Sequence, residues 1–460
     1  MSDSVTTAVE PASDRVILRN KERLEGVVQA VGRRPHDIER RPWESALVFG
    51  AFLVAYGWFG YWLVVDQHVV GFETLDRLNR ALMIWHNDPA KLSALGFDYP
   101  PLATLLVSPL TLVPALARTL LVVPLASALF AALAMVGINT MMRRATIAAP
   151  LRVAVLAALG ANPLVVLYAA SGARELIWLS LVVMAVGALF AWYVTADIRF
   201  VMLAGLTFSV AALSGYSSLI WFVISAVLIG VVLARLGADG TEIEGTTVGF
   251  ASPTAYVIAL WAAFNLLLLG NPVDWITSSR EAAGGVDVFS AADLVRTTGQ
   301  LVLDGAPIAL LVLPGLLFAG LARGNTFALG LAMLLGTSIV MPAAAVALHL
   351  TDSPMAMRNA LPILFFSVIG ALWLARSAGD SAALVSAGLV VGLLVSIPWT
   401  FQAMKTYPYQ SLEAPFAAAV STGQSQEGAQ TLSGESVGIA SEQEMADWIV
   451  DHVTRTDSIL

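Results

Sequence analysis

The polar stretch from Gly71 to Leu102 holds the side chains of this sequence that can do acid–base chemistry. Its acids are Glu73, Asp76, Asp88 and Asp98. A carboxylate can remove a proton from a hydroxyl group within hydrogen-bond distance, so each acid is a candidate general base. Apolar residues recur at steps of three and four over 72–85, which predicts a helix there. Its polar face carries Glu73, Asp76, Arg77 and Arg80. This spacing also permits plain i, i+4 ion pairs, which are the alternative interpretation.

The pattern Tyr99-Pro100-Pro101 ends this stretch in an extended corner, because a residue that precedes proline avoids the helical conformation. The corner would hold Asp98 at the membrane surface and place Tyr99 where it can contact a substrate. The alternative interpretation is a plain entry turn for the apolar segment that follows.

The composition places these residues in a membrane protein. The chain has 460 residues, 57% of them hydrophobic and 13% charged, and a mean hydropathy of +0.76. A soluble domain has about 25% charged residues, so this chain cannot cover a water-facing surface and belongs in lipid. Cysteine is absent, which excludes disulfides and thiolate metal sites. The net charge of -8 gives no reason to expect a nucleic-acid partner.

About eleven apolar segments can be membrane-spanning helices, since a helix needs about 20 residues to cross the hydrocarbon core. They are 46–65, 119–141, 153–170, 176–194, 200–215, 219–233, 254–269, 301–321, 326–350, 361–375 and 382–401. The run 102–116 is shorter and contains Pro109 and Pro114, so we expect it to lie in the interface or to re-enter. The predicted fold class is an all-α polytopic membrane protein with interfacial helices in its first external loop.

Arginine predicts the orientation, because basic residues collect in short cytoplasmic loops. Residues 1–42 end in an arginine-rich stretch and form a predicted cytoplasmic tail. Residues 43–402 are then the transmembrane domain, with the first external loop at 66–101. Residues 403–460 would be an external linker and the start of a small soluble domain. The scarcity of lysine beside arginine indicates a GC-rich bacterial genome, and hence a bacterial plasma membrane.

Three motifs resemble those of a known group of membrane enzymes. The first is the acid-bearing external loop, which ends in an aromatic-Pro-Pro-Leu corner before an apolar run. The others are ANPLVVLYAASGARE, from Ala161 to Glu175, and MRNALP, from Met357 to Pro362. Together they resemble the GT-C superfamily of membrane glycosyltransferases. The likeness is to its family-39-like members, which include protein mannosyltransferases and lipid A aminoarabinose transferase, and it covers most of 46–401.

The resemblance implies an enzyme that takes a sugar from a polyprenyl-phosphate carrier on the external side of the membrane. The sugar would pass to a hydroxyl of a glycan, lipid or protein acceptor, with inversion. By position, Asp76 matches the catalytic acid of the family and would act as the general base. Some members carry two adjacent acids at this place, whereas here Arg77 follows. The alternative catalytic acids are therefore Glu73, Asp88 and Asp98.

Such a transfer also needs a cation for the phosphate that leaves. Arg358 is the first candidate, because it precedes a helix whose positive N-terminus would add to its field. Arg280 and Arg174 are further candidates, and an anchor to lipid headgroups is the alternative role of Arg358. Predicted substrate contacts are Tyr99, Glu175 and Tyr216. No ligand spacing demands a metal site, although the loop acids can bind a divalent cation.

The main rival function is a transporter or flippase of a lipid-linked sugar, and a second rival is a non-catalytic membrane scaffold that presents its external tail to a partner. Transporters place charged residues near the middle of the membrane and often contain inverted repeats. The middle of the predicted spans carries almost no charge, and we find no repeat in the sequence. The sequence therefore favours the enzyme.

Overall fold

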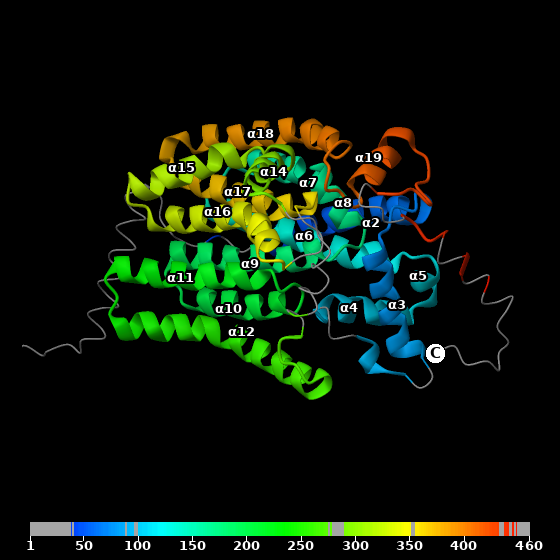
Figure 1. Cartoon of the computed structure of the whole chain (residues 1–460). Coiled ribbons are helices and arrows are strands. Elements are labelled where there is room, and N and C mark those ends of the chain that lie inside the picture. Colours follow the sequence, from blue (N-terminus) through cyan, green and yellow to red (C-terminus); the bar gives the residue numbers. More distant parts are fainter. Residues whose placement is uncertain are drawn as a thin grey trace, which may run out of the picture.

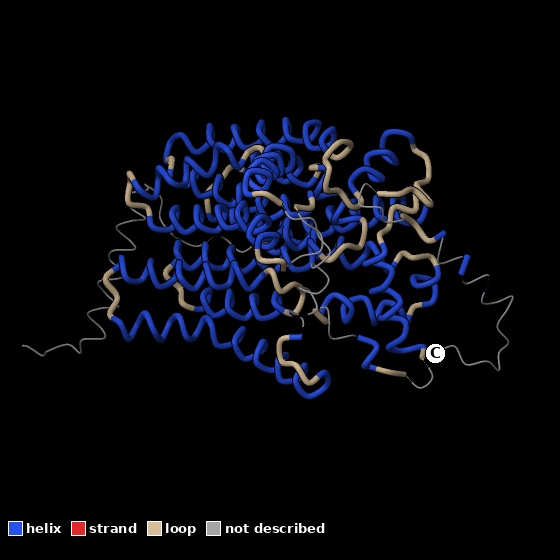
Figure 2. The backbone as a smooth tube through the Cα atoms, in the orientation of Figure 1, coloured by secondary structure: helices blue, strands red, loops and turns tan. Residues whose placement is uncertain are grey.

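The structure is a computed structural model that describes residues 41–87, 90–95, 100–274, 289–350 and 355–431, together with 38, 277, 437–440, 444, 445 and 448. In this part of the chain, helices joined by short loops form a bundle (Figure 1), and the backbone trace contains helix and loop (Figure 2). The predicted all-α class is confirmed. Among the described residues, eight helices are long and apolar enough to cross a membrane. They are α2 (Pro42–Gly60, continued by the π-helical turn η1 at Tyr61–Asp66), α6 (Val122–Arg144), α9 (Glu175–Thr195), α11 (Ser218–Leu236), α12 (Gly240–Leu269), α16 (Thr326–Ala347), α17 (Ala360–Ser377) and α18 (Ala382–Ala403).

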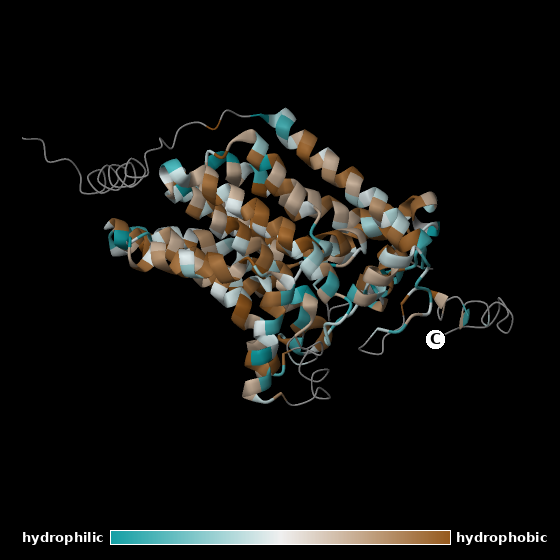
Figure 3. Cartoon of the chain, turned by 90° about the horizontal axis from the view of Figure 1, so that it is seen from above, coloured by the Kyte–Doolittle hydropathy of each residue, from teal (hydrophilic) through white to brown (hydrophobic). Residues whose placement is uncertain are grey.

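Hydrophobic residues predominate along the length of these helices, and hydrophilic residues are more frequent at their ends and in the loops (Figure 3). A bilayer core offers no water to the backbone. A helix satisfies its N–H and C=O groups internally, so it is the stable form for such apolar sequences in lipid. The chain is a multi-pass membrane protein.

The bundle has an inner layer and a lipid-facing layer. Within their most apolar windows, α17, α9 and α6 are 89%, 83% and 72% buried in the protein, whereas α2 and α12 are 22% and 17% buried. Their mean hydropathies all lie between 1.6 and 2.1, because lipid tails and a protein interior are both apolar surroundings. Packing therefore decides which helices are central.

Two of the predicted spans are each broken into two helices. The segment 153–170 divides into α7 (Ala149–Gly160) and α8 (Pro163–Ala170), bent by 67°. The Asn162 side chain accepts a hydrogen bond from the Leu164 N–H and so caps α8, while Pro163 has no N–H with which to continue α7. The segment 301–321 divides into α14 (Ala291–Gly305) and α15 (Ala309–Leu321), bent by 101° at a break that contains Pro307.

The predicted number of spans also needs correction. The segment 200–215 forms α10 (Arg199–Ala212), whose 14 residues are fewer than a straight crossing needs. At 1.5 Å per residue this helix covers about 21 Å, less than the hydrocarbon thickness of roughly 30 Å. We expected about eleven spans. The described residues contain eight single helices that can cross a membrane, or up to ten spans if each broken pair crosses once.

The first loop folds as short helices beside one end of the bundle. They are α3 (Phe72–His86), the 3-10 helix η2 (Leu92–Leu95), α4 (Leu102–Val107), the 3-10 helix η3 (Ser108–Leu112) and α5 (Pro114–Arg118). The run 102–116 is too short to cross and packs against α3 instead. Trp85 Nε1 donates to Ser108 Oγ at 2.5 Å, and His86 Nε2 lies 3.3 Å from the Thr111 carbonyl oxygen.

Charged residues gather at two opposite ends of the bundle. At one end, here named the mixed-charge end, α3 pairs with Arg174 directly before α9 and with Arg358 just before α17, and Arg358 also pairs with Glu175. At the other, the arginine end, Arg376 near the end of α17 donates to the carbonyl of Arg144 at the end of α6. Helices α9 and α17 have 21 and 18 residues. They therefore separate the two ends by about 30 Å, close to the hydrocarbon thickness.

The segment after the last span returns to the mixed-charge end. We name residues 404–431 the C-terminal strap; it includes α19 (Glu413–Thr422), which packs against α8. Farther along, the Gln426 N–H donates to the Gln67 carbonyl at 2.8 Å. Helices α19 and α3 lie at the same end of the bundle in Figure 1. The division of the chain into units at 42 and 402 stays a prediction, and most of 1–42 and 432–460 falls outside the described residues.

Candidate functional site

Helix α3 forms where the sequence predicts it, and its packing directs its charged face. Leu78 and Ala81 are buried in a small apolar cluster with Val107 and Val122. The predicted apolar stripe is buried in its middle, while its ends, Phe72 and Trp85, are exposed. Burial of one face turns the charged residues of α3 toward the start of α9.

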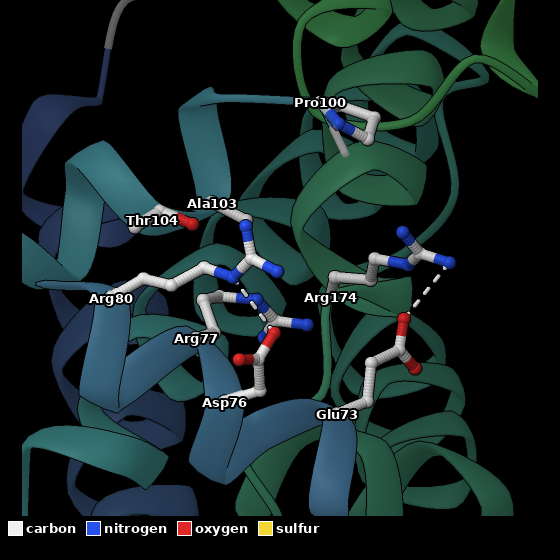
Figure 4. A pocket seen from close by; sticks show the side chains of 8 residues that line it. All are labelled: Glu73, Asp76, Arg77, Arg80, Pro100, Ala103, Thr104 and Arg174. Carbon is white, nitrogen blue, oxygen red and sulfur yellow. Dashed lines mark hydrogen bonds and ion pairs between the residues drawn. The ribbon is translucent and has the colours of Figure 1, made fainter. Parts of the chain in front are cut away.

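A pocket lies between α3, the start of α4 and the residue that precedes α9. Its lining consists of Glu73, Asp76, Arg77, Arg80, Pro100, Ala103, Thr104 and Arg174. It encloses about 310 Å³ of empty space, its open mouth included. Three guanidinium groups and two carboxylates converge here (Figure 4). This lining suits an anionic ligand held next to a carboxylate.

Both carboxylate oxygens of Glu73 are held by arginines from distant parts of the chain. Oε1 lies 2.9 Å from Arg174 Nη2, and Oε2 lies 3.5 Å from Arg358 Nη1. The positive charge of Arg174 lowers the pKa of the Glu73 carboxyl to about 2, against the opposing effect of burial and with help from Arg358 and Arg77. So weak a base takes up a proton poorly near neutral pH, and Glu73 is better suited to orient arginines.

Arg77 points to a backbone carbonyl and does not form the i, i+4 ion pair with Glu73 that its spacing permits. Its Nη1 donates to the Gly172 carbonyl at 3.0 Å. Gly172 has a φ of +77°, and a Cβ there would lie 2.7 Å from the Val123 carbonyl oxygen, so the turn between α8 and α9 requires glycine. Burial lowers the pKa of Arg77, yet a guanidinium stays charged at neutral pH. Arg77 therefore ties α3 to the turn that carries Arg174.

Asp76 differs from Glu73 in its partners, because among the described residues an arginine contacts only one of its two carboxylate oxygens. Arg80 Nε lies 2.9 Å from Oδ2, which is the predicted i, i+4 pair. The two side chains are 29% and 26% exposed and line the pocket. Among the residues that the structure describes, none donates a hydrogen bond to Oδ1. Asp76 thus offers a carboxylate oxygen that can accept a proton.

Arg358 belongs to the same cluster, although it is distant from Glu73 along the sequence. It lies in the 3-10 turn η4 (Met357–Asn359) before α17, and its Nη1 is 3.3 Å from Glu175 Oε1. Glu175 occupies the first turn of α9, where the helix dipole favours an acid. The two side chains are 22% and 10% exposed. Arg358 therefore engages protein acids, in contrast to the headgroup anchor considered as its alternative role.

The predicted site residues divide into three groups. Four of them meet in one charged cluster, namely Glu73, Arg174, Glu175 and Arg358, and Asp76 lies in the adjoining pocket. Tyr216 is elsewhere, in the turn between α10 and α11, where its hydroxyl accepts a hydrogen bond from Trp261 Nε1 at 2.7 Å. The others lie outside the described residues, namely Asp88, Asp98, Tyr99 and Arg280.

Two members of the cluster were missed by sequence reasoning. The Tyr168 hydroxyl donates to Glu413 Oε1 at 2.6 Å, and both residues interact electrostatically with Arg358. Tyr168 lies inside the Ala161–Glu175 motif, so that motif was a usable signal. Glu413 is one of several acids in the segment after the last span, and only the packing of the strap brings it to the site.

The described part of the site contains no evident group of metal ligands. Across the described ranges, no three His, Asp or Glu side chains are grouped so that they could hold a metal ion. The acids of the cluster are held by arginines or by a tyrosine hydroxyl instead. The divalent cation that the sequence allows stays a prediction.

Comparison with known proteins finds a distant structural likeness. No protein-family model matches the chain, and no curated protein matches it. The fold is similar to the crystal structure of the Archaeoglobus fulgidus oligosaccharyltransferase in the apo form, with a TM-score of 0.48 and 12% sequence identity. The match covers 89% of this chain and 58% of the other, so this chain spans little more than half of that protein. At this similarity, the function of the chain must be argued from its own residues.

Proposed function

We propose that this chain is a membrane glycosyltransferase of the GT-C type. It would move a sugar from a polyprenyl-phosphate donor to a hydroxyl of a glycan, lipid or protein acceptor, with inversion. The observation that supports this most is a single pocket that combines an accessible carboxylate, Asp76, with the guanidinium groups of Arg77, Arg80 and Arg174. Transfer of a phosphate-linked sugar needs both kinds of group within reach of one reacting carbon.

Residues of the pocket and of the adjoining charged cluster divide the reaction between proton removal and phosphate binding. Asp76 takes the proton of the acceptor hydroxyl while the hydroxyl oxygen attacks the anomeric carbon. The bond between that carbon and the phosphate oxygen breaks, and its electron pair leaves with the phosphate. Arg174 and Arg358 stabilise the negative charge of the departing polyprenyl phosphate. Attack from the face opposite the phosphate inverts the anomeric configuration.

Glu73 has a supporting role in this scheme. It contacts Arg174 with one oxygen and Arg358 with the other, so it holds two guanidinium groups side by side. A phosphate that enters would meet cations already in place, and such preorganised charge needs little rearrangement during the reaction. Of the two described acids of α3, Asp76 is therefore the better candidate for the base.

We infer that the mixed-charge end faces the exterior of a bacterial plasma membrane. Arg144, Arg152 and Arg376 lie at the opposite end of the bundle, and basic residues mark the cytoplasmic side. The N-terminus would then be cytoplasmic and the C-terminal strap external. Donor and acceptor would meet at the outer surface.

The variant Asp76→Asn tests the proposed base, since it keeps the shape of the side chain and removes its charge. Purified protein would receive a panel of polyprenyl-phosphate-linked sugars with cell-envelope extract as the acceptor source, and released polyprenyl phosphate would be measured. We expect release from at least one donor by the wild type. The variant should lose about 10²- to 10⁴-fold in rate at an unchanged unfolding temperature.

Asp66→Asn is the matched control, because Asp66 is an exposed acid at the end of η1 that does not line the pocket. It should keep the wild-type rate. A wild-type rate for Asp76→Asn would show that another group is the base. If no donor is consumed while the protein moves a lipid-linked sugar across liposome membranes, the transporter replaces the enzyme.

A further inference from the structure

The C-terminal strap runs along the segment that carries Arg358. The Tyr407 hydroxyl donates to the Met355 carbonyl at 2.8 Å, and the Met357 N–H donates to the Tyr409 carbonyl at 3.1 Å. These contacts hold the strap beside η4, directly before α17. They bring Glu413, the first residue of α19, to the mixed-charge end.

The side chain of Glu413 is fully buried. A carboxyl group is rarely buried unless it has a hydrogen-bond or charge partner. Its Oε1 accepts a hydrogen bond from the Tyr168 hydroxyl at 2.6 Å, and its Oε2 accepts one from the Ser411 N–H at 2.6 Å. Burial raises the pKa of this carboxyl, although the two hydrogen bonds and Arg358 oppose the rise. Its charge therefore changes at higher pH than that of an exposed glutamate.

The charge of Glu413 acts electrostatically on the guanidinium group of Arg358. The electrostatic partners of this guanidinium are Glu175, Glu73, Tyr168 and Glu413. Glu73 and Glu175 make direct ion pairs with it from α3 and α9, whereas Glu413 acts on it from the strap. A negative charge beside a guanidinium reduces the attraction of that guanidinium for a second anion. An ionised Glu413 thus weakens the hold of Arg358 on a phosphate.

We propose that Glu413 tunes the affinity of Arg358 for the phosphate of the lipid donor, which makes the C-terminal strap part of the substrate site. The inference rests on the proposed function for the nature of its ligand. Several arginines that bind a donor phosphate also retain the product phosphate, and product release limits the turnover of many enzymes. An ionised Glu413 favours release, and a neutral Glu413 favours binding.

Binding of a short prenyl methyl phosphate to the purified full chain tests this role. The ligand is a phosphodiester whose charge stays constant in the range used, and the prenyl alcohol of equal length measures partition into detergent. Glu413→Gln can keep both hydrogen bonds, because its amide oxygen accepts from the Ser411 N–H while its amide donates to the Tyr168 oxygen. At a pH above the raised pKa of Glu413, where the wild-type carboxyl is ionised, we expect this variant to bind about tenfold more tightly than the wild type.

The pH dependence supplies a readout that a merely structural role would not change. As the pH falls through the raised pKa of Glu413, this carboxyl takes up a proton, the wild type gains affinity, and the two proteins converge. Other titratable or charged groups around Glu413 and its neighbours are Tyr168, Arg358, Glu73, Glu175, Tyr407 and Asp304. Both proteins contain all of these, so the difference between the two profiles reports Glu413.

Two further variants locate the effect. In an Arg358→Gln background, Glu413→Gln should change the affinity by less than about twofold, because two residues that act through one another are not additive. Glu427→Gln is the matched control in the same strap, since Glu427 pairs with His68 at 2.8 Å and not with Arg358. It should bind the phosphodiester with wild-type affinity.

Several results would overturn the proposal. Equal affinities of the wild type and Glu413→Gln at every pH would do so, as would an undiminished effect in the Arg358→Gln background. If Glu413→Gln does not fold, a flat pH profile of the wild type decides against it. No saturable phosphate binding by the wild type would refute this role together with the proposed function. The expected binding pattern without turnover of any donor would refute the proposed function alone.

Discussion

The two ends of the bundle both carry arginines, yet the arginines have different kinds of partners. At the arginine end, Arg152 pairs with Glu44 at 2.7 Å and also donates to the Ile147 carbonyl at 3.1 Å. Arg376 donates to the carbonyl of Arg144, which is the last residue of α6. Arg376 thus satisfies a carbonyl group at the C-terminal end of a helix, as expected for a basic residue there, while Arg152, near the start of α7, binds one acid and one loop carbonyl.

At the mixed-charge end, the arginines instead belong to a network in which one acid contacts two arginines and one arginine contacts two acids. Glu73 contacts both Arg174 and Arg358, and Arg358 also contacts Glu175. A pocket opens beside this network. The comparison shows that the number of arginines does not reveal a site. The arrangement of their partners reveals it, because acids shared between arginines hold guanidinium groups beside the pocket.

The sharpest test of this comparison is the side of the membrane on which each end lies. The chain has no cysteine, so Asn79→Cys on α3 and Thr195→Cys at the end of α9 can be labelled separately. Both positions are exposed. In intact cells we expect an impermeant maleimide to label the α3 position and not the α9 position. The reverse pattern would place the mixed-charge end in the cytoplasm and contradict external transfer.

The next largest effect is expected from Arg358→Gln. This change removes the guanidinium shared by Glu73 and Glu175 and should lower the transfer rate by about 10²- to 10³-fold, the cost of losing one donor to a developing anion. Arg358→Lys should recover part of the rate, because it restores charge without the planar fork. Rates would be normalised to folded protein from an unfolding scan. A rate within a fewfold of wild type for Arg358→Gln would remove this residue from the site.

The smallest effect is expected from Arg152→Gln at the arginine end. Loss of the largely buried pair with Glu44 should lower the free energy of unfolding by about 1–3 kcal/mol, while the transfer rate per folded molecule stays at the wild-type value. Thermal unfolding and the release assay measure the two quantities. The double variant with Glu44→Gln should recover stability, since it leaves no unpaired acid. A loss of transfer in stable Arg152→Gln protein would erase the distinction between the two ends.

How far the sequence predicts this molecule depends on how local each feature is. Helix α3 agrees with its prediction to within one residue, because its apolar repeat is a property of neighbouring residues. The breaks at Asn162 and Pro307 were equally local signals, but hydropathy summed over a window conceals them. The pairing of Glu73 with Arg174 was not predictable, since Arg77 offered a nearer partner of the same charge.

The order of the residues is enough to predict an all-helical membrane protein in which α3 is amphipathic with a charged face. These are consequences of composition and of the helical repeat. Only the tertiary structure decided that Glu73, Glu175, Arg358 and Glu413 form one cluster. These residues lie far apart along the chain, and a charge can select its partner only after packing has placed the helix ends together. Distance and burial govern that pairing, and neither quantity can be read from the sequence alone.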